Sequence, residues 1–200
     1  MVRSGKSYGL PQGHPQPIIS SSTAHLELRP QQLSARVSPT ISIVRTLTFR
    51  TAELTDLDAI VRLVNRAFVA ESPYVEGERV NTATVHEMWV RGKFLLGEDQ
   101  GMLTACIFIE PRGKRAHLGL VSVEPARQGE GLGAQLMAAA EAQCHAAGFH
   151  EMELRFINHR TELQRFYTRL GFVPSGITEA AVAARIKVPF LFVQMTKSLL

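Results

Sequence analysis

The sequence predicts a mixed α/β domain in which a mostly antiparallel sheet is flanked by helices on both faces. Two observations support this class. Strand-like runs follow one another in the first half of the domain, and strand and helix patterns alternate in the second half. Antiparallel neighbours followed by a β-α-β-α section are typical of a mixed sheet with helices on both sides.

Residues 1–45 are predicted to be a disordered extension that precedes a domain over residues 46–200. The extension holds five of the ten prolines and eight serines, and it shows no sustained helical or strand period. Such a composition buries too little apolar surface to offset the entropy lost on ordering. The extension is also rich in arginine and poor in acids, as organelle transit peptides are, although its prolines disfavour the amphipathic helix that import requires. We therefore expect a cytoplasmic protein, with organelle targeting as the alternative.

The charge distribution argues against a nucleic-acid partner. Of the net charge of +4, all is located in residues 1–45, and residues 46–200 contain seventeen basic and seventeen acidic side chains. Nucleic-acid binding depends on clustered cations that neutralise phosphates. The longest apolar runs also fall short of the roughly 20 residues that a membrane span needs. Cys106 and Cys144 lie in apolar patterns and are too few for a disulfide framework, so we expect both to be buried thiols.

The first elements are predicted from periodicity. Residues Thr46–Thr51 alternate like a strand, and Thr55–Asp58 resembles a capping-box start. One helix face then follows, formed by Ile60, Leu63, Val64, Ala67 and Phe68. A short helix is expected around Val85–Val90. Three strands come next, over Lys93–Leu96, Met102–Glu110 and His117–Val123, of which the last two form a hairpin through the turn at Pro111–Lys114.

The second half alternates between helix and strand. Leu132, Leu136, Ala140 and Cys144 mark a helix that Gly148 closes. Residues Glu151–Ile157 alternate as a strand. Leu163, Phe166, Tyr167 and Leu170 repeat with helical spacing before Gly171, and Pro189–Met195 is the last predicted strand. Residues Ser175–Val188 are expected to be a loop.

The segment between the predicted hairpin and the long helix contains three alternate glycines, Gly129, Gly131 and Gly133. Glycine allows positive φ and a close approach of a ligand to the backbone. The first N–H groups of a helix have no internal acceptor and lie at the positive end of its dipole. Together these features predict a cradle for an anion, most simply a phosphate or pyrophosphate.

Several interpretations of this glycine loop compete. A Walker loop is excluded because Gly-Lys-Ser/Thr is missing. A dinucleotide fingerprint is formally met by Gly129, Gly131 and Ala134, but that motif normally follows the first strand of a parallel sheet and calls for an acid that closes the next strand. A third pattern, Arg/Gln-x-x-Gly-x-Gly/Ala, is met by Gln128, Gly131 and Gly133. A glycine-rich turn without a ligand is the remaining interpretation.

The run from Val121 to Leu136 resembles the acetyl-CoA-binding motif of the GNAT family of acyltransferases. Residues Thr46–Phe68 are similar to the first strand and helix of that family, and Phe166–Phe172 to its closing Phe-Tyr-x-x-Leu-Gly-Phe segment. The resemblance covers residues 46–196. It implies a V-shaped cofactor cleft and transfer of acetyl from acetyl-CoA to a primary amine, on a small molecule or a peptide, by direct attack in a ternary complex and without a metal.

The resemblance also implies the site residues. The backbone of Val121–Val123 would pair with the pantetheine arm, and residues 128–134 would hold the pyrophosphate. The predicted cofactor-binding residues are Val121, Ser122, Val123, Gln128, Gly129, Glu130, Gly131, Leu132, Gly133, Ala134 and Asn158. The family commonly has Arg where this chain has Gln128. Either Arg127 supplies the missing charge or it is a solvated surface residue, and Asn158 is alternatively a turn residue.

The resemblance implies that Tyr167 is the general acid, because a tyrosine hydroxyl can donate a proton to a departing thiolate. The alternative is that Tyr167 only packs in the core. Glu110 is the first candidate for the base, with His117 or a water relay as alternatives. Between Ala70 and Trp89 the acids Glu71, Glu76, Glu78 and Glu87 outnumber the one base, Arg79. This excess either forms a mildly acidic wall suited to a cationic amine or is a solvated face.

Direct transfer leaves Cys106 and Cys144 without a catalytic role. Two other functions remain open at this point: a non-catalytic module that senses CoA on the same fold, and a nicotinamide-dependent oxidoreductase. The protein is expected to be a monomer or a homodimer, and nothing in the sequence names the amine acceptor.

Overall fold

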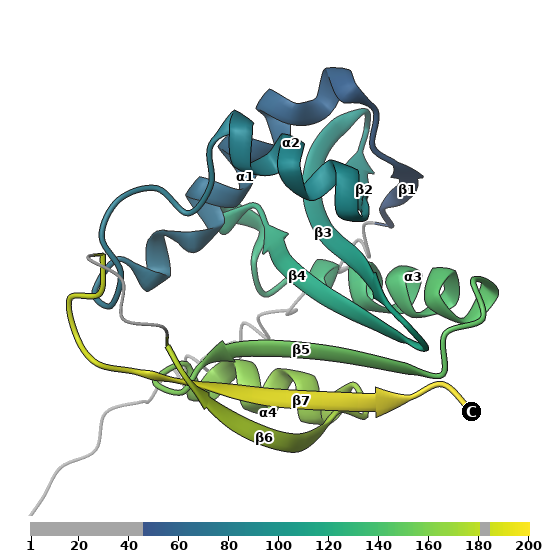
Figure 1. Cartoon of the computed structure of the whole chain (residues 1–200). Coiled ribbons are helices and arrows are strands. Elements are labelled where there is room, and N and C mark those ends of the chain that lie inside the picture. Colours follow the sequence, from purple (N-terminus) through teal and green to yellow (C-terminus); the bar gives the residue numbers. More distant parts are fainter. Residues whose placement is uncertain (1–45, 181–184) are drawn as a thin grey trace, which may run out of the picture. The chain divides into compact units, whose positions relative to one another are not determined.

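The computed structural model describes residues 46–180 and 185–200, so the predicted extension over residues 1–45 lies outside the described residues. The described part contains a seven-stranded sheet with the order β1-β2-β3-β4-β5-β7-β6 (Figure 1). The strands are β1 (Thr48–Thr51), β2 (Lys93–Asp99), β3 (Met102–Arg112), β4 (Arg115–Val123), β5 (Glu151–Ile157), β6 (Val173–Glu179) and β7 (Leu191–Ser198). All neighbouring pairs are antiparallel except β4 and β5, which are parallel. This arrangement confirms the predicted mixed, mostly antiparallel sheet.

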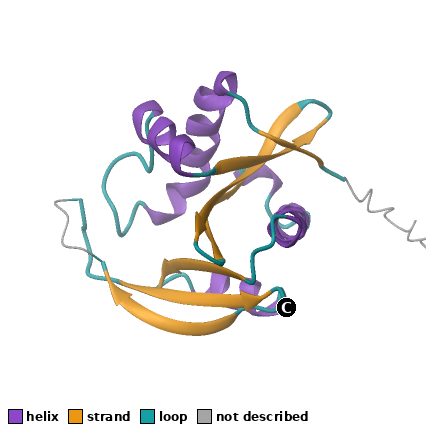
Figure 2. Ribbon diagram, turned by 45° about the vertical axis from the view of Figure 1, so that its right-hand side comes forward, coloured by secondary structure: helices purple, strands orange, loops and turns teal. Residues whose placement is uncertain are grey.

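Helices cover both faces of the sheet. They are α1 (Leu57–Ala67), α2 (Thr82–Arg91), α3 (Leu132–Ala146) and α4 (Thr161–Arg169), with short 3-10 turns over Leu54–Asp56, Phe68–Glu71 and Pro125–Arg127. Figure 2 shows α1 and α2 on one side of strands β2–β4 and α3 on the other. The four predicted helices are thus present at the expected positions.

Alternating side chains of the central strands build two cores. Phe94, Leu96 and Phe108 pack with α1 and α2 on one face. Leu95, Ile107 and Leu118 pack with α3 and α4 on the other face. Adjacent residues of β2 therefore enter opposite cores, because successive side chains of a strand point to opposite faces. Cys106 and Cys144 are buried in these cores, one in each, as predicted.

The antiparallel pairing of β3 with β4 is interrupted by a bulge. Cys106 pairs with Ser122, but Phe108 pairs with Gly119, so that two steps along β3 match three steps along β4. Leu120 lies in the extra stretch and has φ +49°, in the left-handed region that residues other than glycine rarely adopt. Bulges bend the strand that carries them and increase its local twist.

The parallel pairing of β4 with β5 ends where this bend begins. The paired residues run from Arg115↔Glu151 to Leu118↔Leu154, and no pairing is recorded for the rest of either strand against the other. In Figure 1 the two strands lie side by side at one end and diverge toward the other. Residues 119–123 of β4 are therefore not paired with β5, and this edge of the strand is open.

Two local expectations were wrong. Residues Ser175–Glu179 belong to β6, which pairs with β7 at the edge of the sheet, rather than to a loop. The strand was hidden because all but one of its residues are exposed, so it has no alternating apolar pattern. The start of α1 also differs: a 3-10 turn precedes the helix, and the Asp56 carboxylate accepts a hydrogen bond from the Glu53 N–H at 2.7 Å.

The turn from α2 into β2 depends on Gly92. A Cβ atom at this position would lie 2.3 Å from the carbonyl oxygen of Ile109 and 2.9 Å from the Phe108 ring. We expect Gly92→Ala to destabilise the fold by about 3 kcal/mol, because a backbone atom of a central strand must move. Gly101→Ala is the matched control: its Cβ has no neighbour within 4 Å, and its positive φ should cost about 1 kcal/mol. Equal denaturation midpoints for the two variants would contradict this account.

Candidate functional site

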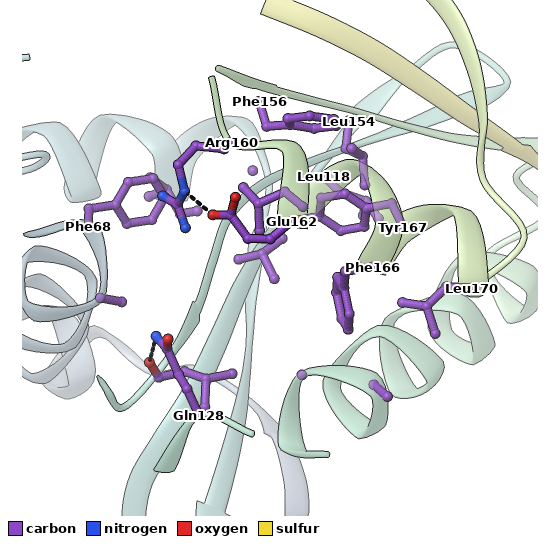
Figure 3. A pocket seen from close by; sticks show the side chains of 18 of the residues that line it. Phe68, Leu118, Gln128, Leu154, Phe156, Arg160, Glu162, Phe166, Tyr167 and Leu170 are labelled. Carbon is purple, nitrogen blue, oxygen red and sulfur yellow. Dashed lines mark hydrogen bonds and ion pairs between the residues drawn. The ribbon is translucent and has the colours of Figure 1, made fainter. Parts of the chain in front are cut away.

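A cavity of about 620 Å³ occupies the space that opens between β4 and β5. Its walls come from the divergent ends of these strands, from the glycine loop with the start of α3, from α4 and from the end of α1. In Figure 3, Phe68, Arg160 and Glu162 lie on one side of the cavity, and Phe166 and Leu170 lie on the other. The predicted V-shaped cleft is therefore present.

The three positions of the loop require glycine for different structural reasons. Gly129 and Gly131 have φ of +88° and +81°, and a Cβ at either would meet no atom within 4 Å. These two positions need glycine for their backbone conformation and leave the main chain accessible. Gly133 instead allows close packing, because its Cβ would lie 3.3 Å from the Phe166 ring. Gly131 is the N-cap of α3, a helix of fifteen residues. The first N–H groups of this helix therefore lie beside the cavity.

Gln128 and Arg127 both line the cavity at this end. The Gln128 Nε2 donates a hydrogen bond to the Val123 carbonyl oxygen at 3.2 Å (Figure 3). Arg127 forms ion pairs with Asp99 at 3.0 Å and with Glu130 at 2.7 Å. Arg127 is therefore a cavity residue whose charge is offset by two carboxylates, rather than a purely solvated side chain.

The open edge of β4 presents mainly backbone groups to the cavity. Val121 and Val123 line the cavity, whereas Ser122 is 1% exposed and points to the opposite face. The Ser122 hydroxyl donates to the carbonyl oxygen of Leu120 at 3.0 Å, which holds the bulge. Of the predicted loop residues, Gly129, Gly131, Leu132, Gly133 and Ala134 line the cavity with Gln128, and Glu130 does not.

Tyr167 lies in the wall formed by α4. Its ring contacts Phe156, Phe166 and Phe172, with ring centroids 5.2 to 5.9 Å apart. The residue is 5% exposed yet lines the cavity, and no hydrogen bond to its hydroxyl is recorded among the described residues. Burial raises the pKa of this phenol well above 10, so the group stays protonated at neutral pH and can act as a donor.

The two candidate bases differ in their position. Glu110 is absent from the cavity lining, and its carboxylate pairs with Arg112 at 2.6 Å and with Arg91 at 3.6 Å. His117, its cross-strand partner, does line the cavity. Burial lowers the pKa of His117 from 6.5, and Arg112 lowers it further, although Glu153 at 3.4 Å from Nδ1 opposes this. A neutral imidazole can accept a proton, so the geometry favours His117 over the predicted Glu110.

Asn158 serves the sheet rather than the cavity. Its Oδ1 accepts a hydrogen bond from the Leu191 N–H at 3.0 Å, and its own N–H donates to the Leu191 carbonyl at 2.8 Å. These contacts join the end of β5 to the start of β7. Asn158 is not among the residues that line the cavity.

The charge of the cavity differs from the mildly acidic wall that was one expectation. Of the four acids between Ala70 and Trp89, only Glu71 lines the cavity. It is 7% exposed, burial raises its pKa, and Arg79 and Arg160 lie 3.6 and 4.0 Å from its carboxylate. The lining arginines are Arg79, Arg127, Arg155, Arg160 and Arg169. The cavity is thus rich in cations.

Sequence reasoning missed the arginines of β5 and of the turn after it. Arg155 lies at a strand position that alternation assigns to the polar face, and Arg160 directly precedes α4. Neither position carries a motif. The only signal was the position of Arg155 near the C-terminal end of β5. Its neighbour β4 is the strand that leads into the glycine loop.

The two cysteines have no contact with this chemistry. Burial raises the pKa of the Cys106 thiol to about 12 and that of Cys144 to about 11, so neither forms a thiolate at neutral pH. Within residues 46–180 and 185–200, no group of three or more His, Cys, Asp or Glu side chains could hold a metal ion. None of the helices described there has the length and apolar character for a membrane crossing.

The cavity is thus bounded by a divergent parallel strand pair, by a glycine loop at one end of the opening and by a buried tyrosine in its wall. The model of the acetyltransferase (GNAT) family matches residues 57–172, and the chain belongs to this family. The mostly antiparallel sheet also differs from the parallel sheet that a dinucleotide fingerprint requires. No curated protein matches the chain in sequence.

Solved structures share the fold at low sequence identity. The ribosomal-protein-S18-alanine N-acetyltransferase from Escherichia coli has a TM-score of 0.65 at 18% identity, covering 76% of this chain and 94% of that one. The ribosomal-protein-alanine N-acetyltransferase from Brucella melitensis has 0.64 at 19%, covering 76% and 99%. A GNAT superfamily phosphinothricin acetyltransferase from Sinorhizobium meliloti, in complex with acetyl-CoA, has 0.64 at 17%, covering 76% and 88%.

Proposed function

We propose that this protein is an N-acetyltransferase that transfers the acetyl group of acetyl-CoA to a primary amine on a small molecule or a peptide. The single observation that carries the proposal is the opening between β4 and β5 with the glycine loop at one end. An extended, amide-rich ligand can pair with the free edge of β4, and its anionic end can meet the start of α3. The acetyl-CoA complex of the Sinorhizobium relative is consistent with this assignment.

The backbone holds the cofactor in this proposal. The N–H groups of Gly129, Gly131, Leu132 and Gly133 bind the diphosphate, since the positive φ at Gly129 and Gly131 leaves the loop main chain accessible. The N–H groups of Gln128 and Ala134, at the two ends of the loop, instead donate to the carbonyl oxygens of Pro125 and Gly131. The main chain of Val121–Val123 pairs with the pantetheine arm, as an added strand would. Because main-chain donors carry most of this binding, Gln128 can occupy a position where the family commonly has arginine. Asn158 has no part in this assignment.

Transfer then proceeds by direct attack. The neutral amine nitrogen attacks the thioester carbonyl carbon, the C–S bond breaks, and the sulfur leaves with the electron pair. Tyr167 donates its hydroxyl proton to the sulfur, and the proton lost by the amine passes to His117 and on to solvent. Tyr167 regains its proton from solvent, so the products are the N-acetyl amine and free CoA.

Acetyl-CoA binding tests the first half of the proposal. We expect acetyl-CoA, but not NAD(P)H, to raise the melting temperature by about 5–10 °C at a hundredfold excess over Kd, because the ligand binds only the native state. Gly131→Ala should lose most of this increment. Gly113→Ala is the matched control, since Gly113 also has positive φ and open space but lies at the β3–β4 turn. An equal increment in both variants would remove the glycine loop from the binding site.

Tyr167→Phe separates catalysis from binding. We expect kcat to fall about 100-fold or more, because the departing thiolate loses its proton donor. The Kd for acetyl-CoA should stay near the wild-type value, since the ring and its packing remain. Tyr74→Phe is the matched control: Tyr74 stacks on His159 with centroids 5.1 Å apart and is not a cavity residue. An unchanged kcat in Tyr167→Phe would leave a CoA-sensing module as the better description.

The role of His117 predicts a pH dependence. Because its folded-state pKa lies below 6.5, His117 is neutral at pH 7. As the pH drops below that pKa, His117 becomes protonated, and the pH profile of kcat/KM should show an acidic limb. The acceptor amine, with a pKa near 10, contributes a separate alkaline limb. His117→Gln should remove the acidic limb only, whereas His86→Gln, an exposed histidine of α2, should leave both limbs. A retained acidic limb in His117→Gln would assign the base to water or another group.

A further inference from the structure

The part of the cavity wall around Arg160 and Glu162, which Figure 3 shows away from Gln128 of the glycine loop, carries more positive than negative charge. Arg79, Arg155 and Arg160 line it, together with the carboxylates of Glu71 and Glu162. Arg185 adds a cation close enough to lower the pKa of Arg79, and it binds the carbonyl oxygens of Glu76 and Glu78 rather than a carboxylate. The described groups thus leave an excess of positive charge at this end.

The two carboxylates are already shared by two of the arginines. Arg160 pairs with Glu162, as Figure 3 shows, and lies 4.0 Å from Glu71. Arg79 lies 3.6 Å from Glu71 and places its guanidinium over the Phe68 ring. Arg155 is different: over residues 46–180 and 185–200 it has no recorded carboxylate partner.

Arg155 is also held in place. Its backbone belongs to β5 and pairs with Gln194 of β7, and its guanidinium lies 4.8 Å from the centre of the Phe192 ring. Phe192 lines the same cavity. A cation held over an aromatic face loses little further freedom on binding an anion. Arginine binds carboxylates with two parallel hydrogen bonds, which gives both strength and orientation.

We propose that the acceptor is a small amine that also carries a carboxylate, of the amino-acid type, and that Arg155 binds this carboxylate. This inference rests on the proposed function. A purely cationic acceptor such as a polyamine would be repelled by the arginines, whereas an amino acid whose nitrogen has lost its proton is an anion that they attract. The same positive charge disfavours the ammonium form of the acceptor, so it also favours the nucleophilic state.

Matched acceptors test the proposal directly. A panel of amino acids is compared with the corresponding amides and decarboxylated amines, for example L-leucine, L-leucinamide and 3-methylbutylamine. We expect kcat/KM of the wild type to be about 10–100-fold higher for the acid than for the amide, which is the range of one charge-assisted hydrogen-bonded contact. Arg155→Gln should abolish this preference by lowering kcat/KM for the acid alone, and Arg155→Lys should retain part of it.

Two controls separate this inference from the proposed function. Arg62→Gln, at an exposed position of α1 outside the cavity, should behave as the wild type. Arg155→Gln should keep the full stabilisation by acetyl-CoA, since the cofactor is assigned to the other end of the cavity. With CoA bound, where no transfer can occur, L-leucine should further stabilise the wild type but not Arg155→Gln.

The outcomes that overturn the inference are distinct. Equal or better use of the amides and simple amines, an acid preference that survives in Arg155→Gln, or acetylation of peptides alone would each reject it while acetyl transfer stands. Absence of transfer to every amine of the panel also rejects it, and stabilisation by acetyl-CoA then shows that cofactor binding survives. Failure of acetyl-CoA to stabilise the wild type would instead reject the proposed function itself.

Discussion

The separation of β4 from β5 is the constraint on which the rest of the molecule depends. A parallel pair would normally continue along both strands, and the main-chain groups of residues 119–123 would then be used up inside the sheet. The bulge at Leu120 bends β4 away after Leu118 and holds it there, with the Ser122 hydroxyl bonded to the Leu120 carbonyl. One leucine in an unfavourable backbone conformation thereby gives the sheet a cavity, and the two cores on either face keep the bend from relaxing.

The cavity divides its chemistry by position. The glycine loop presents main-chain dipoles at the start of α3, while other elements supply guanidinium groups to the cavity wall. The aromatic cluster around Tyr167 forms another part of the wall, and its burial keeps the phenol protonated. A site of this kind can hold an anion at each end and a neutral reacting centre in the middle. This arrangement suits a reaction in which an uncharged nitrogen attacks an uncharged thioester.

Much of the fold and part of the site followed from local sequence. Helix periodicity, strand alternation and the glycine spacing predicted the main elements. The cleft and the position of Tyr167 at it were implied by the family resemblance. The bulge could not be predicted, because Leu120 carries no glycine or proline signal for a left-handed backbone. Strand β6 was missed since it is an exposed edge strand without an apolar face. The role of Glu110 stays a prediction. Its ion pair with Arg91 of α2 could not be predicted, because such a pairing is decided only by tertiary contacts.

The contact between Gly133 and Phe166 joins the glycine loop to the helix that carries Tyr167. A methyl group at position 133 would lie 3.3 Å from the Phe166 ring, so enlargement of residue 133 requires the ring to shift by a few tenths of an ångström. The two positions should therefore vary together among descendants of this chain, and the effects of replacing them should be non-additive in a double-mutant cycle. A substitution at position 133 that moves Phe166 would therefore also move Tyr167, the next residue of α4, even when no ligand is bound.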